Sequence, residues 1–189
     1  MPDVRIDEVG QAKIDRVNAI LKGIGNGSGA FQAIGAAMKR AGDSAKTMAG
    51  RYASETYNIS KGAFMSHCSI TSNMQGGSGG VASIQLLFAG QVIRLIEFNG
   101  TTGGPNGGVH VGPKRGGGEL RRAFITAISS NRGVWERVGK ARFPVEQKYG
   151  PSTGHMMQDE GVSEKLTNHI QEVFDQRIEH EITRILNGW

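Results

Sequence analysis

Glycine-rich segments divide this chain into blocks, and they constrain its fold more than any other feature of the sequence. Glycine supplies 29 of the 189 residues, roughly twice its usual share of about 7%. One cluster occupies residues 76–80, and nine glycines lie within residues 99–118. Because glycine loses more backbone freedom on folding than any other residue, neither segment can hold itself rigid. We expect residues 99–118 to form a flexible, glycine-rich hairpin arm.

Helical periodicity is clearest at the C-terminal end. Over residues 161–189 the apolar side chains recur every three or four positions and charged side chains fill the other face, which predicts a long amphipathic helix. Its apolar positions are Val162, Leu166, Ile170, Val173, Phe174, Ile178, Ile182, Ile185 and Leu186. The same criterion predicts a helix over 6–24, a long alanine-rich helix over 30–57 and a short turn of helix over 60–66.

Strand patterns occupy the middle of the chain. Runs of β-forming residues predict strands over 68–72, 81–88 and 91–98, with a hairpin at Ala89-Gly90 between the last two. A further strand pair, turned at residues 130–133, is expected to complete one antiparallel sheet. The sequence thus predicts an α+β fold: an antiparallel sheet with long N-terminal helices and a long C-terminal helix, in a single domain over 1–189 with a flexible insert at 99–118.

Charge is distributed unevenly along the chain. The formal charge is +5, yet residues 114–148 carry nine basic and three acidic side chains, whereas residues 149–189 carry three basic and seven acidic ones. In one interpretation, the basic middle of one copy pairs with the acidic tail of the next copy in an oligomer. In a second interpretation, the basic block faces a polyanion. Scattered, solvated charge is the third interpretation.

Patterns typical of enzymes and cofactor sites are absent from the sequence. The glycine clusters lack the Lys-Ser/Thr of a phosphate loop, and the five histidines have no metal-ligand spacing. His67 and Cys68 are adjacent, so in a strand their side chains point to opposite faces and do not form a nucleophile–base pair; we expect Cys68 to be a small core residue. We therefore expect no enzymatic activity, no cofactor and no metal.

Two further expectations concern the compartment. Cys68 is the single cysteine and the first residues lack the basic-then-apolar order of a signal peptide, so we expect synthesis in a reducing cytoplasm. No run of about 18 uncharged apolar residues occurs, so we expect no membrane segment.

Three motifs follow one another in the last third of the chain. They are Ala123-Phe124-Ile125, then Asn131-Arg132-Gly133-Val134-Trp135-Glu136-Arg137-Val138-Gly139-Lys140-Ala141-Arg142-Phe143-Pro144-Val145, and finally Tyr149-Gly150-Pro151 ahead of the C-terminal helix. In this order they resemble the minor tail protein Z family of bacteriophages, the tail completion proteins of long-tailed phages. The helices and the Tyr57-Asn58-Ile59 exit of the N-terminal half fit the same pattern, so the resemblance covers nearly the whole chain apart from the glycine-rich inserts.

The motif residues have structural roles that the residue types suggest. Phe124, Ile125, Trp135 and Val138 are expected to form the buried face of the sheet. Gly133 and Gly139 are expected to adopt backbone conformations closed to other residues, and Pro144 and Pro151 to end strands. Tyr149 and Gly150 complete the corner before the last helix.

The resemblance implies a structural virion protein that completes the head-proximal end of the tail. It implies a ring of about six copies around the DNA channel. The neighbours of this ring would be the tail terminator, the tail tube or the head–tail connector or stopper. The resemblance also implies that the protein is made in the host bacterial cytoplasm. Basic residues that would face DNA or a neighbouring copy are Lys114, Arg115, Arg121, Arg122, Arg132, Arg137, Lys140 and Arg142. The alternative is a sequence-nonspecific, basic DNA-binding protein of a mobile element.

Overall fold

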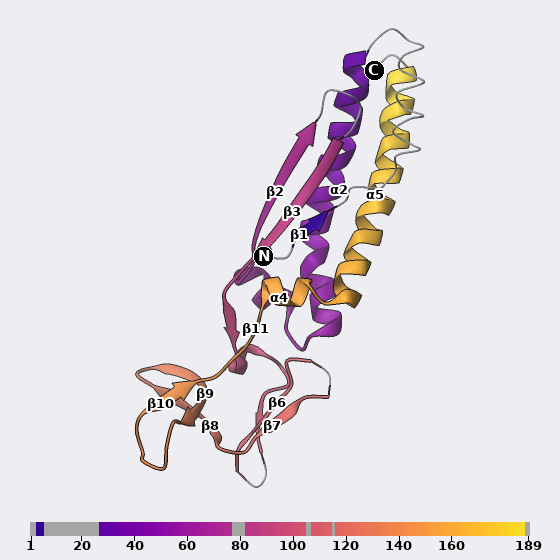
Figure 1. Ribbon diagram of the computed structural model, residues 1–189. Helices are drawn as coiled ribbons and strands as arrows, with labels where there is room; N and C mark the ends of the chain where they lie inside the picture. The colour runs from indigo at the N-terminus through magenta and orange to yellow at the C-terminus, as the bar shows by residue number, and fades with distance from the viewer. Residues whose placement is uncertain (1–2, 6–26, 77–81, 105–106, 115, 188–189) are drawn as a thin grey trace. The chain divides into compact units, whose positions relative to one another are not determined.

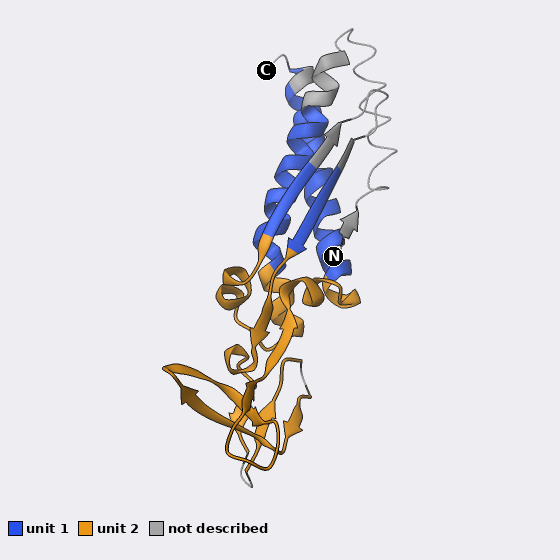
Figure 2. Ribbon diagram, turned by 60° about the vertical axis from the view of Figure 1, so that its left-hand side comes forward, with its two compact units in different colours: residues 1–49, 70–88, 163–189 blue, residues 50–69, 89–162 orange. Residues whose placement is uncertain are grey.

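The computed structural model describes residues 3–5, 27–76, 82–104, 107–114 and 116–187. The chain divides into two compact units, coloured separately in Figure 2: unit 1 comprises residues 1–49, 70–88 and 163–189, and unit 2 comprises residues 50–69 and 89–162. The antiparallel strands of residues 69–152 form a run between the helices of residues 27–66 and the helices of residues 153–186, so the predicted α+β class is confirmed. The helix expected over 6–24 lies outside the described residues.

Unit 1 is built on two long helices and one sheet. Helix α2 (Gly27–Thr56) and helix α5 (Glu160–Leu186) run side by side in opposite directions (Figure 1). The sheet has the order β1-β3-β2, with β1 at Asp3–Arg5, β2 at Ser69–Gly76 and β3 at Ala82–Ala89. Strand β1 pairs antiparallel with β3.

Alanines on α2 allow its neighbours to approach closely. Among the described side chains, six of them are almost fully buried: Ala33, Ala37, Ala41, Ala45, Ala49 and Ala53. Between them Gly42 lies against β3, where an added Cβ would stand 2.5 Å from Cδ1 of Ile84. On β3 the buried side chains alternate along the strand at Ile84, Leu86 and Phe88, as expected for a strand with one face in the core.

Helix α5 buries most of the described part of the face that its periodicity predicts, although Val173 on that face is only half-buried. Val162, Leu166, Ile170, Phe174, Ile178 and Ile182 are all at most 8% exposed. In unit 1, Nε2 of His169 lies 2.8 Å from Oγ of Ser44, which joins α5 to α2.

Unit 2 contains short helices and three small antiparallel sheets. Helix α3 spans Lys61–Ser66, the 3₁₀ helix η1 spans Leu95–Glu97, and helix α4 spans Thr153–Met157. The first sheet pairs β4 (Val92–Arg94) with β11 (Tyr149–Ser152). The second has the order β5 (Thr102–Gly103), β6 (Val109–Val111), β7 (Gly118–Leu120). The third has the order β10 (Val145–Gln147), β9 (Asn131–Arg137), β8 (Ala123–Ile128).

The predicted hairpin at Ala89-Gly90 is wrong. Strand β3 lies between β1 and β2, while β4 pairs with β11, about fifty residues further along the chain. The segment 91–98 also leaves the extended conformation after Arg94 and continues as η1. The strands that the structure describes therefore form four separate sheets instead of the expected single sheet.

The turn before β9 lies two residues earlier than the sequence indicates. Ile128 pairs with Asn131, which leaves Ser129 and Ser130 as a two-residue loop. Both have positive φ, 50° and 67°, the combination that a type I′ hairpin turn requires. Because glycine and asparagine usually fill such turns, two serines give little signal in the sequence.

The glycine-rich segment 99–118 contributes to a three-stranded sheet rather than to one hairpin. Strand β6 pairs with β5 on one side and β7 on the other, and Val109 is 1% exposed. Asn58 joins this segment to the end of α2: its backbone N–H donates to the carbonyl of Pro113 at 2.9 Å, and its Nδ2 donates to the carbonyl of Gly112 at 2.7 Å.

Candidate interaction surface

The β8-β9-β10 sheet of unit 2 carries most of the residues that the sequence singles out. Phe124 pairs with Trp135, and Trp135 pairs with Gln147, so these three side chains share one face of the sheet. Ala123 and Val134 lie on the opposite face and are buried. The sheet is thus packed on the Val134 face and partly exposed on the face of Phe124 and Trp135.

A cation lies against the aromatic face. The guanidinium of Arg137 is 5.6 Å from the centre of the Phe124 ring, within the range of a cation–π contact. The indole N–H of Trp135 donates to the carbonyl of Thr126 at 3.2 Å, which fixes the ring over the sheet. Gly133 is buried between the strands, and an added Cβ there would stand 2.5 Å from Nε2 of Gln147.

The loop 138–144, between β9 and β10, exposes two large apolar side chains. Phe143 is 62% exposed and Val138 is 55% exposed. The loop is closed by a hydrogen bond from the N–H of Val138 to the carbonyl of Pro144 at 3.1 Å. The guanidinium of Arg142 is 5.8 Å from the Phe143 ring centre. We call residues 137–143 the tip surface.

Further cations lie on the tip surface or elsewhere on the same sheet, with Lys140 in the tip surface itself and Arg132 at the other end of β9. Arg122 donates to the carbonyl of Gly139 at 3.2 Å, which ties the turn before β8 to the loop. Arg121, Arg132 and Lys140 are exposed, and within the described part of the chain none of them has an ion-pair partner. The surface therefore combines exposed apolar groups with positive charge, a pairing that suits an acidic partner with an apolar recess.

Other members of the basic block are engaged elsewhere in unit 2. Lys148 lies 2.9 Å from Glu136, and this hydrogen bond raises the pKa of Lys148. Lys114 forms an ion pair with Asp159 and lies 5.3 Å from the ring centre of Tyr57. Arg115 lies outside the described residues. The described basic residues of 114–148 thus do not form one continuous surface.

The Lys114–Asp159 pair brings the basic middle and the acidic tail together within one chain. The hydroxyl of Tyr57 also donates to Asp159, at 3.3 Å. The hydrogen bond from Lys114 lowers the pKa of Asp159 and raises the pKa of Lys114 itself. Burial, followed by the charge of Asp159, raises the pKa of Tyr57. These shifts keep the pair ionised and the phenol protonated at neutral pH.

Several predicted roles of the motif residues need correction. Val138 is exposed rather than buried, and Phe124 and Ile125 point to opposite faces of the sheet and are only half-buried. Neither Gly133 nor Gly139 has a positive φ; Gly133 is required by the close approach of a side chain, and a Cβ at Gly139 would meet nothing. Gly150 lies against Phe98, and a Cβ added at Gly150 would stand 2.6 Å from Cε2 of Phe98.

The two prolines and the tyrosine of the motifs mark the edges of β10 and β11. Pro144 immediately precedes β10, as a strand boundary would, whereas Pro151 lies inside β11, two residues before α4. Tyr149 is 49% exposed, and its hydroxyl donates to Oε1 of Gln147 at 3.1 Å. Helix α4, capped by Ser152, is an element that the sequence patterns did not predict.

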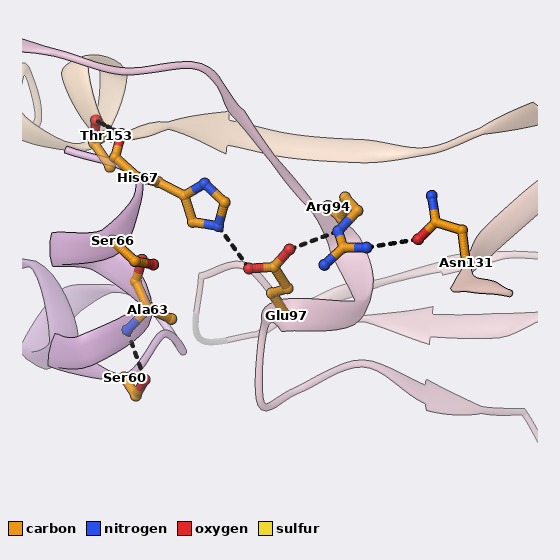
Figure 3. A network of polar contacts seen from close by, with 8 residues as sticks. All are labelled: Ser60, Ala63, Ser66, His67, Arg94, Glu97, Asn131 and Thr153. Carbon is orange, nitrogen blue, oxygen red and sulfur yellow. Dashed lines mark hydrogen bonds and ion pairs between the residues drawn. The ribbon is translucent and has the colours of Figure 1, made fainter. Parts of the chain in front are cut away.

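A network of polar side chains that the sequence did not reveal crosses unit 2. Nε2 of His67 lies 2.7 Å from Oε2 of Glu97, and Nε of Arg94 donates to Oε1 of the same carboxylate at 2.6 Å (Figure 3). Arg94 also donates to Oδ1 of Asn131 at 2.7 Å. These polar contacts join the end of α3, η1, β4 and the start of β9. Burial raises the pKa of Glu97, but the hydrogen bonds from His67 and Arg94 outweigh it and lower the pKa below its usual value of 4.5.

Glu97→Gln is expected to lower the free energy of unfolding by about 1–3 kcal/mol at pH 7, since it removes charge-assisted bonds. A carboxylate whose pKa is lowered by folding stabilises the fold at any pH above its pKa in the unfolded chain. This stabilisation is lost as the pH falls through the pKa of the carboxylate in the folded state. The difference between wild type and variant in urea denaturation should therefore narrow below pH 4.5. Glu146→Gln, 64% exposed, is the control with little expected effect. An equal difference at pH 7 and about pH 3 would contradict this role.

An open groove in unit 2 is lined by residues of β4, β6, β7, β9 and β11. Its two lobes, of about 770 and 640 Å³, share Val111, Pro113, Pro151 and His155. Lys148 and Glu136 stand in the first lobe, and Tyr57 and Lys114 in the second. The charges that line the groove are thus already paired with one another or with Asp159.

The described residues do not bring together a metal or nucleophile site. Within them no group of three or more His, Cys, Asp and Glu side chains could hold a metal ion. Cys68 is half-buried rather than a core residue, and burial raises the pKa of its thiol, although a hydrogen bond with Thr153 opposes this. No helix in the described part of the chain is long and apolar enough to cross a membrane.

No family model matches the chain, and neither the curated proteins nor the solved structures contain a match.

Proposed function

We propose that this chain is a structural subunit of a bacteriophage virion that completes the head-proximal end of the tail and joins it to the head–tail connector. The observation that carries the proposal is the tip surface, where Val138 and Phe143 are exposed among cations. Aromatic and arginine side chains are enriched at the energetically important positions of protein interfaces. The proposal that the assembly is a phage tail is supported by the order of the motifs in residues 123–151, which resembles the minor tail protein Z family.

The tip surface is suited to docking because its base is held while its apolar groups remain exposed. The bonds of Val138 to Pro144 and of Arg122 to Gly139 restrain the loop at both ends. A preorganised loop loses little conformational entropy when a partner covers it. Burying Val138 and Phe143 against a neighbouring subunit would then contribute about 25 cal/mol for each Å² of apolar surface removed from water.

The proposed partners are copies of the same chain, in a ring of about six, and the tail terminator, tail tube or connector proteins next to it. The ring would surround the channel through which the genome passes. In such a ring Arg121, Arg132 and Lys140 face either the acidic surface of the next copy or the phosphates of the DNA. Exposed acids on α5 that would complement them include Glu164 and Glu172.

The particles of the phage that encodes the chain provide the test. Mass spectrometry of purified virions should detect the chain in low copy number, and antibody labelling in electron micrographs should place it where the tail meets the head. Particles made without it should accumulate tails that fail to join heads. Purified infectious virions that lack the chain would overturn the proposal.

A second candidate, a sequence-nonspecific DNA-binding protein of a mobile element, is favoured by the three cations that lack a partner among the described residues, Arg121, Arg132 and Lys140. Such binding would weaken with salt, with a slope of about −0.9 per phosphate neutralised. Salt-dependent affinity for duplex DNA from a monomer or dimer, together with no ring in light scattering or electron microscopy, would favour this candidate over the virion subunit.

A further inference from the structure

A second group of cations lies in unit 1, between α2 and α5. A cavity of about 660 Å³ opens between the two helices, and both contribute positive charge to it: Lys39 and Arg40 from α2 and Arg177 from α5. A volume of this size is in the range of small-molecule sites, about 300–1,000 Å³. All three cations are exposed to solvent.

The cavity is formed by one stripe of each helix. On α2 its lining residues include Ala36, Lys39, Asp43 and Thr47, which are spaced by three and four positions and so share a face. On α5 the lining residues span a single turn, 173–177. The bond between Ser44 and His169 joins the two helices one turn away from Val173. The walls of the cavity are therefore fixed by helix packing.

The charge of the cavity is not balanced by the acid that lines it. Asp43 is the one carboxylate among the lining residues that the structure describes. It lies 3.2 Å from Nζ of Lys46, which also donates to Oγ of Ser72 on β2 at 3.0 Å. Lys46 therefore offsets Asp43. Lys39, Arg40 and Arg177 have no acidic partner within 4.0 Å in the described residues.

Three cations that share one cavity repel one another unless an anion lies between them. A phosphate group matches this arrangement because its oxygens accept two parallel bonds from a guanidinium and a further bond from an ammonium. The side-chain amide of Gln176, which also lines the cavity, adds a neutral donor. A single carboxylate would neutralise only one of the three charges.

We propose that the cavity between α2 and α5 binds phosphate groups, held by Lys39, Arg40 and Arg177. The phosphates belong either to a small polyphosphate anion or to the backbone of a nucleic acid. The proposal is independent of the tip surface and of the virion role, since every residue that it uses lies in unit 1.

Two probes distinguish the sources of the phosphate. Isothermal titration calorimetry of the full chain with inorganic tripolyphosphate, at low ionic strength, measures binding of a small anion. Fluorescence anisotropy with a labelled DNA duplex measures binding of a backbone. We expect Arg177→Gln and Lys39→Gln each to weaken binding of the recognised probe by about tenfold or more. Because both side chains are exposed, circular dichroism should show both variants folded.

Two further variants serve as controls. Arg184→Gln removes another exposed arginine of α5, which pairs with Glu181 at 3.1 Å, and Arg51→Gln removes an exposed arginine of α2 outside the cavity, whose Nε lies 3.7 Å from Glu55. Both should bind like the wild type. Tripolyphosphate binding that Arg177→Gln weakens supports a small-anion site, and duplex binding alone with the same loss supports a backbone site. Absence of binding to both probes, or wild-type affinity in Arg177→Gln and Lys39→Gln, would overturn the proposal.

Discussion

Gly90→Ala is expected to lower the free energy of unfolding by about 2–3 kcal/mol. A Cβ at this position would stand 2.0 Å from Oγ1 of Thr153 and 2.4 Å from the carbonyl oxygen of His67. Neither atom can retreat at low cost, because Thr153 is fully buried at the start of α4 and the His67 carbonyl belongs to the backbone that caps α3. Urea denaturation of the wild type and the variant measures the difference.

Gly62→Ala is the matched control for this substitution. Gly62 lies in α3, also in unit 2, and an added Cβ there would meet nothing within 4 Å. Alanine is the better helix former by up to about 1 kcal/mol, so this variant should be as stable as the wild type or slightly more stable. If Gly90→Ala were also neutral, Gly90 would not be packed closely against the end of α3 and the start of α4.

Phe64→Ala is expected to cost about 3–5 kcal/mol, more than Gly90→Ala. Phe64 is fully buried on α3, so its removal loses the burial of a whole ring and leaves a cavity. Phe143→Ala removes the same side chain from the tip surface, where it is 62% exposed. That variant should change stability by no more than about 0.5 kcal/mol.

The comparison of the two phenylalanines bears on function as well as on stability. Thermal or urea denaturation of both variants, under one set of conditions, gives the two free-energy differences. A large loss for Phe64→Ala with none for Phe143→Ala would mean that folding does not require the exposed ring. A comparable loss for both would mean that Phe143 is part of the core, and would remove the main support for a docking role.

Elements with a local signal could be predicted from the sequence. Leu166, Ile170 and Phe174 lie on one side of a helix by their spacing alone, and all three are buried. The alternation of Ile84, Leu86 and Phe88 likewise marks a strand before any partner is known. In both cases the periodicity of the buried residues follows from backbone geometry, so no information about distant segments is needed.

Pairings between distant segments could not be predicted. Strand β4 has three residues and pairs with β11, across more than fifty positions, and nothing in Val92–Arg94 indicates that partner. His67 meets Glu97 thirty positions away, and Lys114 meets Asp159 forty-five positions away. The charge blocks were visible in the sequence, but one of their contacts is made within the chain itself.

The cavity between α2 and α5 shows a similar limit. Lys39 and Arg40 could be placed on the polar side of a predicted helix, where solvated charge is the usual outcome. Their proximity to Arg177 depends on how two helices more than a hundred residues apart pack against each other. Only the packed structure brings these three charges to one place.

The proposed virion role of the tip surface is tested most directly by complementation. A phage that lacks the gene is supplied with Val138→Ser/Phe143→Ser protein, and the titre of infectious particles is measured against wild-type protein. Val92→Ser, which alters another exposed apolar residue, 54% exposed, is the control. We expect the double variant to fold normally yet to lower the titre by about tenfold or more, as the loss of an interface anchor would, while the control keeps it. Wild-type titre from the folded double variant would contradict the virion role.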